Sequence, residues 1–101
     1  MDENALRWLM NTEEGRQVIL GILELAGVYR TDVSAEKNTN AYFAGRRSIG
    51  TDILQEIRNL KRSGETEDGL ALEYRMIRED QERRERASRE EKAKWENILD
   101  D

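Results

Sequence analysis

The stretch REDQERRERASREEKAK, residues 78–94, has charged side chains at thirteen of its seventeen positions. Only Ala87 and Ala93 are apolar, so this stretch has no face that a hydrophobic core could cover. An acid nevertheless stands four positions before a base five times, and each such pair stabilises a helix by about 0.2–0.5 kcal/mol. The pairs are Glu79–Arg83, Asp80–Arg84, Glu82–Arg86, Glu85–Arg89 and Glu90–Lys94. The stretch therefore predicts a helix whose sides are all exposed to solvent.

The start of this helix is marked by Thr66, Glu67 and Asp68, a cluster typical of helix N-termini. A helix from there to about residue 98 would be roughly 50 Å long at ~1.5 Å per residue. A compact domain of this size has a radius of gyration of only about 13 Å. We therefore expect two parts: a helical head over residues 1–77, and a charged helical arm over residues 78–101 that projects from it.

The head is expected to contain the remaining helices, and the fold class is all-α, with a head of three or four helices. A short helix lies within the first ten residues, and Asn11 or Thr12 can cap a second one that ends at Gly27. A third is expected over residues 38–62, after a connection over residues 28–37. The predicted apolar faces are Leu6, Leu9 and Met10, then Val18, Ile19, Ile22, Leu23, Leu25 and Ala26, then Tyr42, Ile49, Ile53, Ile57 and Leu60, then Leu70, Tyr74 and Ile77 with Leu72 and Met76 beside them.

Two glycines interrupt the third helical pattern. A glycine in a helix interior costs roughly 1 kcal/mol relative to alanine. Gly45 and Gly50 therefore predict either a close approach of another backbone or a break near residue 45.

Composition excludes several classes of function. The 101 residues include no Cys and no His, so neither thiolates nor imidazoles are present to act as nucleophiles, general bases or metal ligands. Neighbouring carboxylates such as Glu13 and Glu14 diverge on a helix instead of converging across a cleft, so we expect no enzyme, no metal and no cofactor. No apolar run reaches the roughly 18 residues of a membrane span, and the polar N-terminus does not resemble a signal peptide. With a net charge of -5 and no basic patch, generic binding to duplex DNA is disfavoured.

The candidate interaction residues in the head are Arg46 and Arg47, with Tyr29 and Arg30 as neighbours. A guanidinium group binds carboxylates and phosphates in a bidentate manner, so the arginine pair could face an acidic or phosphate-bearing partner. The simpler interpretation is that one or both pair with an acid of the same chain, such as Asp52 or Glu24, or face water. Tyr29 is better explained as a half-buried packing residue.

A second candidate lies at the end of the arm, where Trp95, Ile98 and Leu99 are spaced three or four apart after the charged stretch. These side chains can fold back on the head, pair in a homo-oligomer, or dock into a groove of another protein. The absence of an apolar heptad stripe in residues 78–94 argues against a true coiled coil. We therefore favour a partner or an end-to-end contact.

Short motifs in the head resemble a known family. They are Thr12 with Gly15-Arg16, the run Gly27-Val28-Tyr29-Arg30, and Gly45-Arg46-Arg47 with Gly50, followed by Tyr74 and Met76. Their order is similar to that of the small helical phage domain first named from a Bordetella bacteriophage, over about residues 8–77. The resemblance implies a virion-associated or assembly role without catalytic activity. The charged arm is not part of what the resemblance implies.

Together these features predict a bacteriophage virion protein that acts by protein–protein binding. It could be a minor or internal virion component, a part of the ejection apparatus, or a scaffold-like factor. Its partners would be capsid, portal or internal virion proteins, and it would be found in the virion and, during assembly, in the host cytoplasm. The alternative is a small acidic phage inhibitor that binds a host enzyme.

Overall fold

The computed structural model describes residues 1–29 and 40–99 and contains four helices there. They are α1 (Glu3–Met10), α2 (Glu13–Ala26), α3 (Asn40–Arg58) and α4 (Gly69–Leu99). Within these ranges the only β-type contact is an isolated bridge between Ser63 and Thr66. The predicted all-α class and the long C-terminal helix are confirmed.

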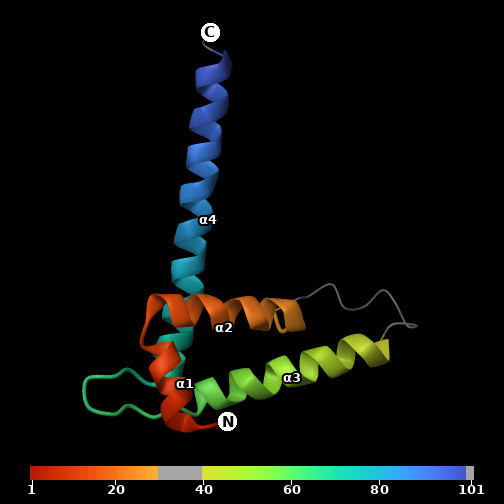
Figure 1. Cartoon of the computed structure of the whole chain (residues 1–101), viewed down its shortest axis with the longest axis vertical. Coiled ribbons are helices and arrows are strands. Elements are labelled where there is room, and N and C mark those ends of the chain that lie inside the picture. Colours follow the sequence, from red (N-terminus) through yellow and green to blue (C-terminus); the bar gives the residue numbers. More distant parts are fainter. Residues whose placement is uncertain (30–39, 100–101) are drawn as a thin grey trace.

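The four helices form a thin, angular molecule (Figure 1). α2 and α3 lie side by side and extend away from the lower part of α4, while α1 packs where they meet it. The upper part of α4 stands clear of the other helices (Figure 1). The Cα radius of gyration is 17.4 Å and the principal extents are 55 × 46 × 16 Å. These dimensions exceed those of a compact domain of this length, because the α2–α3 pair and α4 both project from the core.

Capping residues define where the helices begin and end. Asp2 accepts the backbone N–H of Ala5, and Thr12, the N-cap of α2, accepts that of Gly15. Asp68 accepts the N–H of Ala71 at the start of α4. Gly27 ends α2 with φ of 75°, a conformation that favours glycine. The expected end of α2 at Gly27 is confirmed. Of the two capping candidates, Asn11 and Thr12, the N-cap is Thr12.

The hydrophobic core lies at the junction of all four helices. Its members come from α1, the first three turns of α2, the end of α3 with Leu60 beyond it, and the first turns of α4. The buried residues are Leu6, Met10, Ile19, Leu20, Leu23, Leu54, Ile57, Leu60, Leu72 and Met76. No side chain of α4 beyond Met76 belongs to this core, so the next turns of that helix are held by the polar contacts of Glu79, Arg83 and Arg84.

The predicted apolar faces are only partly correct. In α4 the expected stripe is wrong: Leu70 and Tyr74 are exposed, and the core is instead formed by Leu72 and Met76. Apolar residues occur on two sides of this helix, so periodicity could not identify which side meets the head. In α2 and α3 the core is reached by only part of each predicted face, because the two helices extend beyond it (Figure 1). The side chains left exposed are Val18, Ile22, Leu25, Tyr42 and Ile49.

The boundaries and glycines of α3 also differ from expectation. The helix ends at Arg58, before the expected end at residue 62, and it is continuous through Gly45, so the predicted break is wrong. Gly50 does mark a close approach, but of side chains: a Cβ there would lie 2.4 Å from Val28 Cγ2 and 2.5 Å from Ala26 Cβ. The expected connection over residues 28–37 lies mostly outside the described residues.

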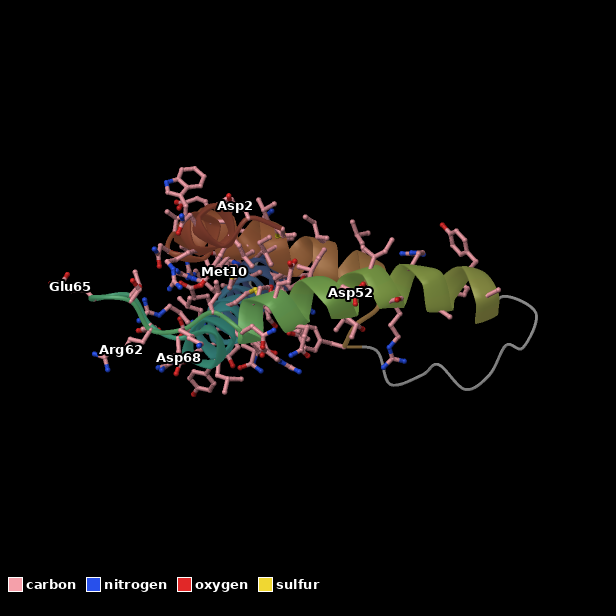
Figure 2. The ribbon with its side chains drawn as sticks, turned by 90° about the horizontal axis from the view of Figure 1, so that it is seen from below. Asp2, Met10, Asp52, Arg62, Glu65 and Asp68 are labelled. Atoms are coloured by element: carbon pink, nitrogen blue, oxygen red, sulfur yellow. The ribbon has the colours of Figure 1, made fainter. Side chains whose placement is uncertain are left out.

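The connection between α3 and α4 turns the chain sharply. Gly69 N–H donates to the carbonyl of Leu60 at 2.8 Å, and a Cβ at Gly69 would lie 1.8 Å from the Ile57 carbonyl oxygen. Figure 2 shows Arg62 and Glu65 on this turn, on the side opposite to the direction in which α3 extends. The close contact at Gly69 sets the first turn of α4 directly against the end of α3.

Two truncations separate the projecting part of α4 from the part that supports the head. Removing residues 87–101 leaves the ion pairs of Glu79, Arg83 and Arg84 with α2 intact, so we expect the free energy of unfolding to change by less than about 1 kcal/mol. Removing residues 79–101 also removes Glu79 and leaves Arg16 buried without its carboxylate, which should cost about 3 kcal/mol or more. Urea unfolding of dilute protein, followed by circular dichroism, measures both. An equal loss in the two variants would contradict this division.

Candidate functional site

An ion pair between α2 and α4 fixes the two helices against each other. Arg16 donates from Nε to Glu79 Oε1 at 2.7 Å and from Nη2 to Oε2 at 2.8 Å. Its third nitrogen, Nη1, donates to the carbonyl of Met10 at 2.8 Å, at the end of α1. The Arg16 side chain is 7% exposed and that of Glu79 is 18% exposed. One guanidinium group therefore joins three helices in a bidentate geometry that excludes most water.

The electrostatics of this pair are mutually reinforcing. The hydrogen bond from Arg16 holds the pKa of Glu79 below its usual range, against the opposing effect of burial. The same contact raises the pKa of Arg16. The neighbouring Gly15 allows the pair to form, since a Cβ at that position would lie 2.0 Å from the Leu9 carbonyl oxygen. The Gly15-Arg16 dipeptide thus has a structural role at the α1–α2 turn.

A second polar cluster joins α3 and α4 to the end of α2. The carboxylate of Glu73 accepts two hydrogen bonds from Arg58, at 2.7 Å and 3.0 Å, and one from the Tyr29 hydroxyl at 2.9 Å. The hydrogen bond from Arg58 is the main cause that lowers the pKa of Glu73. Burial and the contact with Glu73 raise the pKa of Tyr29. Tyr29 is therefore partly covered and its hydroxyl is engaged within the protein, while any part in partner binding stays a prediction.

Arg46 lies beside aromatic side chains at the far end of α3. Its guanidinium carbon is 5.6 Å from the Tyr42 ring centroid and 5.7 Å from that of Phe43, and Nη2 donates to the carbonyl of Leu25. The expected acid Glu24 pairs instead with Arg84 of α4 at 3.0 Å. Arg47 is exposed. The predicted pair is thus divided, with Arg46 oriented by its neighbours and Arg47 presented to solvent.

The remaining predicted residues lie elsewhere. Arg30 falls outside the described residues. Trp95, Ile98 and Leu99 are on the last turn and a half of α4 and are exposed, Trp95 by 60%. The arm holds them away from the described part of the head (Figure 1), so they are not covered by a fold-back in this structure.

An apolar stripe on α2 is a further exposed surface. Val18, Ile22 and Leu25 follow one another at spacings of four and three, which places them on one side of the helix. All three are exposed. The α2 stripe and the arm tip are thus two of the apolar surfaces that the described helices leave uncovered.

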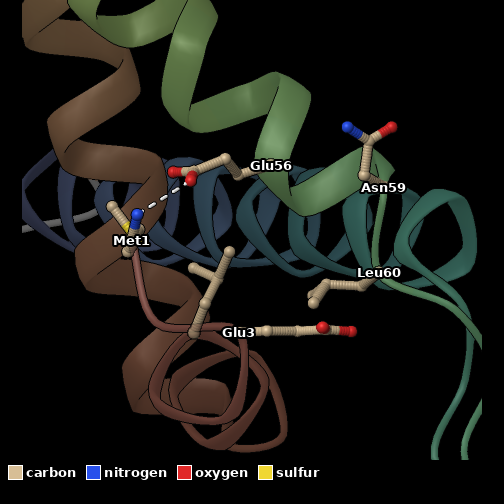
Figure 3. Close-up of a pocket in the computed structure, with 6 residues that line it drawn as sticks. Met1, Glu3, Glu56, Asn59 and Leu60 are labelled. Carbon is tan, nitrogen blue, oxygen red and sulfur yellow. Dashed lines mark hydrogen bonds and ion pairs between the residues drawn. The ribbon is translucent and has the colours of Figure 1, made fainter.

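The N-terminal side of the head has a shallow pocket of about 240 Å³ (Figure 3). Its lining residues are Met1, Glu3, Leu6, Glu56, Asn59 and Leu60. The N-terminal ammonium group lies 3.0 Å from Glu56 Oε1, so the carboxylate on that wall of the pocket is already paired. The pocket is smaller than the ~300 Å³ at which small-molecule sites begin. Among residues 1–29 and 40–99, no group of three acidic, His or Cys side chains is arranged to hold a metal ion, and no helix is long and apolar enough to cross a membrane.

The fold and these contacts define a small helical protein in which a long charged helix is fastened by ion pairs to a thin helical head. Residues 6–72, two thirds of the chain, match the family described as Bbp19-like phage protein. The chain belongs to this family of phage proteins, as the resemblance of its motifs indicated. No curated protein and no solved structure matches the chain.

The sequence analysis does not predict the ion pairs between helices that four residues of the two polar clusters form. These residues are Arg16, Arg58, Glu73 and Glu79. A signal for two of them exists. Arg16 occupies the same helical stripe as the core residues Ile19 and Leu23, and a charged residue on an apolar face indicates a buried ion pair. Glu73 likewise adjoins Leu72 on the face that Met76 occupies. Nothing in one sequence identifies which distant residue each one pairs with.

The two lowered carboxylate pKa values give a pH dependence with a definite sign. A carboxylate whose pKa is lower in the folded state stabilises the fold above its unfolded pKa, and this stabilisation is lost as the pH falls through the folded pKa. The free energy of unfolding should therefore decrease between pH 6 and pH 3. In Glu79→Gln we expect a loss of about 1–3 kcal/mol at pH 7 and a smaller decrease towards pH 3 than in the wild type.

The matched control is Glu82→Gln, which alters an exposed pair with Arg78 on the same helix. We expect that substitution to cost less than about 1 kcal/mol. Chemical denaturation across the pH range measures all three proteins. An identical pH profile for wild type and Glu79→Gln would show that the Arg16–Glu79 pair contributes nothing to stability.

Proposed function

We propose that this phage protein is a structural or assembly component of the virion and acts by binding other virion proteins through its exposed helix faces. The observation that carries the proposal is the position of its exposed apolar side chains. The arm tip lies at the free end of α4, and the α2 stripe runs along α2, which extends sideways from α4 (Figure 1). Uncovered apolar surface of this kind is typical of protein-binding sites.

The shape of the molecule supports the same interpretation. Its shortest extent is 16 Å, between one and two helix diameters, while the other two are 55 Å and 46 Å. A chain of this length folded in this way exposes much more surface than a compact domain and has a smaller core. Such a form suits a protein that fits between larger partners.

The partners that fit this role are capsid, portal or internal virion proteins. The protein would be a minor or internal virion component, an ejection-apparatus component or a scaffold-like factor, present in the virion and in the host cytoplasm during assembly. Arg46 and Arg47 offer a contact for an acidic partner, because guanidinium groups bind carboxylates in a bidentate manner.

A small acidic inhibitor of a host enzyme is the second candidate, favoured by the net charge of -5. Several acids of α4 are, however, already paired with bases of this chain: Glu73 with Arg58, Glu79 with Arg16, and Asp80 with Arg84. This pairing weakens a version in which a row of free carboxylates imitates nucleic acid.

The direct test is mass spectrometry of virions purified from the phage that encodes the chain. We expect the protein in intact particles at a fixed copy number. Its absence from particles, together with recovery from infected cells in complex with one host enzyme, would overturn the virion role in favour of the inhibitor.

Substitutions on the α2 stripe test the binding surface itself. Because Ile22 and Leu25 are exposed, Ile22→Asp with Leu25→Asp should change the free energy of unfolding by less than about 1 kcal/mol. Incorporation into particles should fall at least about tenfold if this surface binds a partner. Gln17→Asp on the same helix is the control. Equal incorporation of all three proteins would exclude the α2 stripe as the binding surface.

The arginine pair is tested separately by Arg46→Ala with Arg47→Ala. Loss of an exposed cation–π contact costs about 0.5–1 kcal/mol, so the fold should be retained. If the pair binds an acidic partner, incorporation should fall several-fold and the remaining incorporation should be less sensitive to salt. A loss of several kcal/mol in stability would instead indicate a role within the fold.

A further inference from the structure

α4 carries a row of side chains in addition to the face that meets the head. This row, here named the seam, follows alternating spacings of four and three residues, the spacing of helix pairs that supercoil around each other. Its members are Leu70, Tyr74, Ile77, Gln81, Arg84, Ser88, Glu91, Trp95 and Ile98. The seam is apolar at both ends and polar in the middle. At its ends Tyr74 is 67% exposed and Trp95 is 60% exposed.

Most of the seam is open for contact, but Arg84 already binds Glu24 of α2 and Asp80 of its own helix. Leu72, which is buried against the head, stands about 200° around the helix from Leu70, because each residue advances by ~100°. In the view roughly along α4, α1 lies on one side of it, and no other helix of the described chain lies on the opposite side (Figure 2). A second helix could therefore lie along the seam, displacing at most the exposed pair between Arg84 and Glu24.

We propose that two copies of this chain pair in antiparallel orientation along the seam, so that the arm tip of each copy covers the base of α4 in the other. Parallel pairing would also bring the apolar ends together, but it would set Arg84 and Glu91 each against its own counterpart, whereas reversal brings Arg84 within reach of Glu91 of the second copy. Placing Tyr74 opposite Ile98 of the second copy also places Ile77 opposite Trp95. The two-fold axis then repeats this contact at the other end of the seam, about 36 Å away at ~1.5 Å per residue.

The polar middle of the seam favours this occupant over a continuous apolar helix. In the same register Arg84 lies opposite Ser88 and within reach of Glu91 of the second copy, and Gln81 lies opposite Glu91. A helix with an uninterrupted apolar stripe would instead remove the charged groups of Arg84 and Glu91 from water and offer them no polar contact, which is costly. Only a helix that is polar at its centre and apolar at both ends avoids this, and the chain itself supplies one.

The charges beside the seam are mixed. Asp80 approaches Lys94 of the second copy, while Arg78 approaches Lys92 and Glu85 approaches its own counterpart. Like charges oppose pairing, and the apolar layers are confined to the two ends. The dimer should therefore be weak, with a dissociation constant on the order of micromolar. It is a side-by-side pairing of two arms with apolar contacts only at its two ends, in contrast to a coiled coil with a continuous apolar seam.

Sedimentation equilibrium of the purified full chain over about 1–200 μM tests the pairing without any phage component. We expect a monomer–dimer transition accompanied by a blue shift of the tryptophan emission. Tyr74→Ala and Trp95→Ala, at opposite ends of the seam, should each weaken the dimer at least about tenfold. Trp8→Ala, on the exposed side of α1, is the matched control and should leave it unchanged. A monomer at all concentrations, or a dimer that tolerates both seam substitutions, would overturn the proposal.

Cross-linking tests the orientation, because the chain has no native cysteine. An equimolar mixture of Tyr74→Cys and Ile98→Cys chains should form disulfides between the two variants on mild oxidation. Each variant alone should form few disulfide-linked homodimers. Predominant Ile98→Cys homodimers would indicate parallel arms and overturn the proposal. The pairing does not depend on the virion role: its failure would leave the presence of the protein in particles untouched, and absence from particles would leave the dimer untouched.

Discussion

The ion pair between Arg16 and Glu79 is the contact on which the direction of α4 depends. The apolar core reaches only to Met76 on that helix, so nothing beyond this residue is held by hydrophobic packing. Arg16 reaches one turn further, binds Glu79 with two nitrogens and the end of α1 with the third. Outer contacts of Arg83 with Glu13 and of Arg84 with Glu24 then continue the attachment at the surface, where each is worth little alone.

This attachment explains why a small core suffices for such an extended molecule. Glycines at positions 15, 50 and 69 bring helices and turns into direct contact, and each position would clash with a Cβ. The polar clusters around Glu79 and Glu73 then join the three long helices without adding apolar volume. Much of the family resemblance has the same basis: Thr12, Gly15 and Arg16 form the α1–α2 turn and the ion pair, and Tyr29 binds Glu73. The exposed Arg47, the α2 stripe and the arm tip are left for contacts with other molecules.

The sequence alone predicts the helices well and their packing only in part. Capping residues such as Thr12, Gly27 and Asp68 act locally, so the helix starts and the end of α2 could be derived from neighbouring residues. The end of α3 was misplaced because it depends on Gly69 meeting the Ile57 carbonyl, a contact between separate elements. The face of α4 is mispredicted because the first turns of its seam are as apolar as its core side, and a single sequence does not state which one the head covers. The candidate residues Arg46, Tyr29 and Trp95 were chosen by type and position, and their use by a partner stays a prediction.

If α4 is held as described, the monomer has a fixed, extended shape that no compact arrangement reproduces. Small-angle X-ray scattering of the monomer fraction, separated by size-exclusion chromatography, measures this directly. We expect a radius of gyration close to the 17.4 Å of the Cα trace, increased slightly by side chains and hydration, and a maximum dimension of at least about 55 Å. A radius of gyration near 13 Å, the value of a compact domain of this length, would mean that the arm folds back on the head. That result would contradict both the projecting arm and the role of Arg16 and Glu79 in directing it.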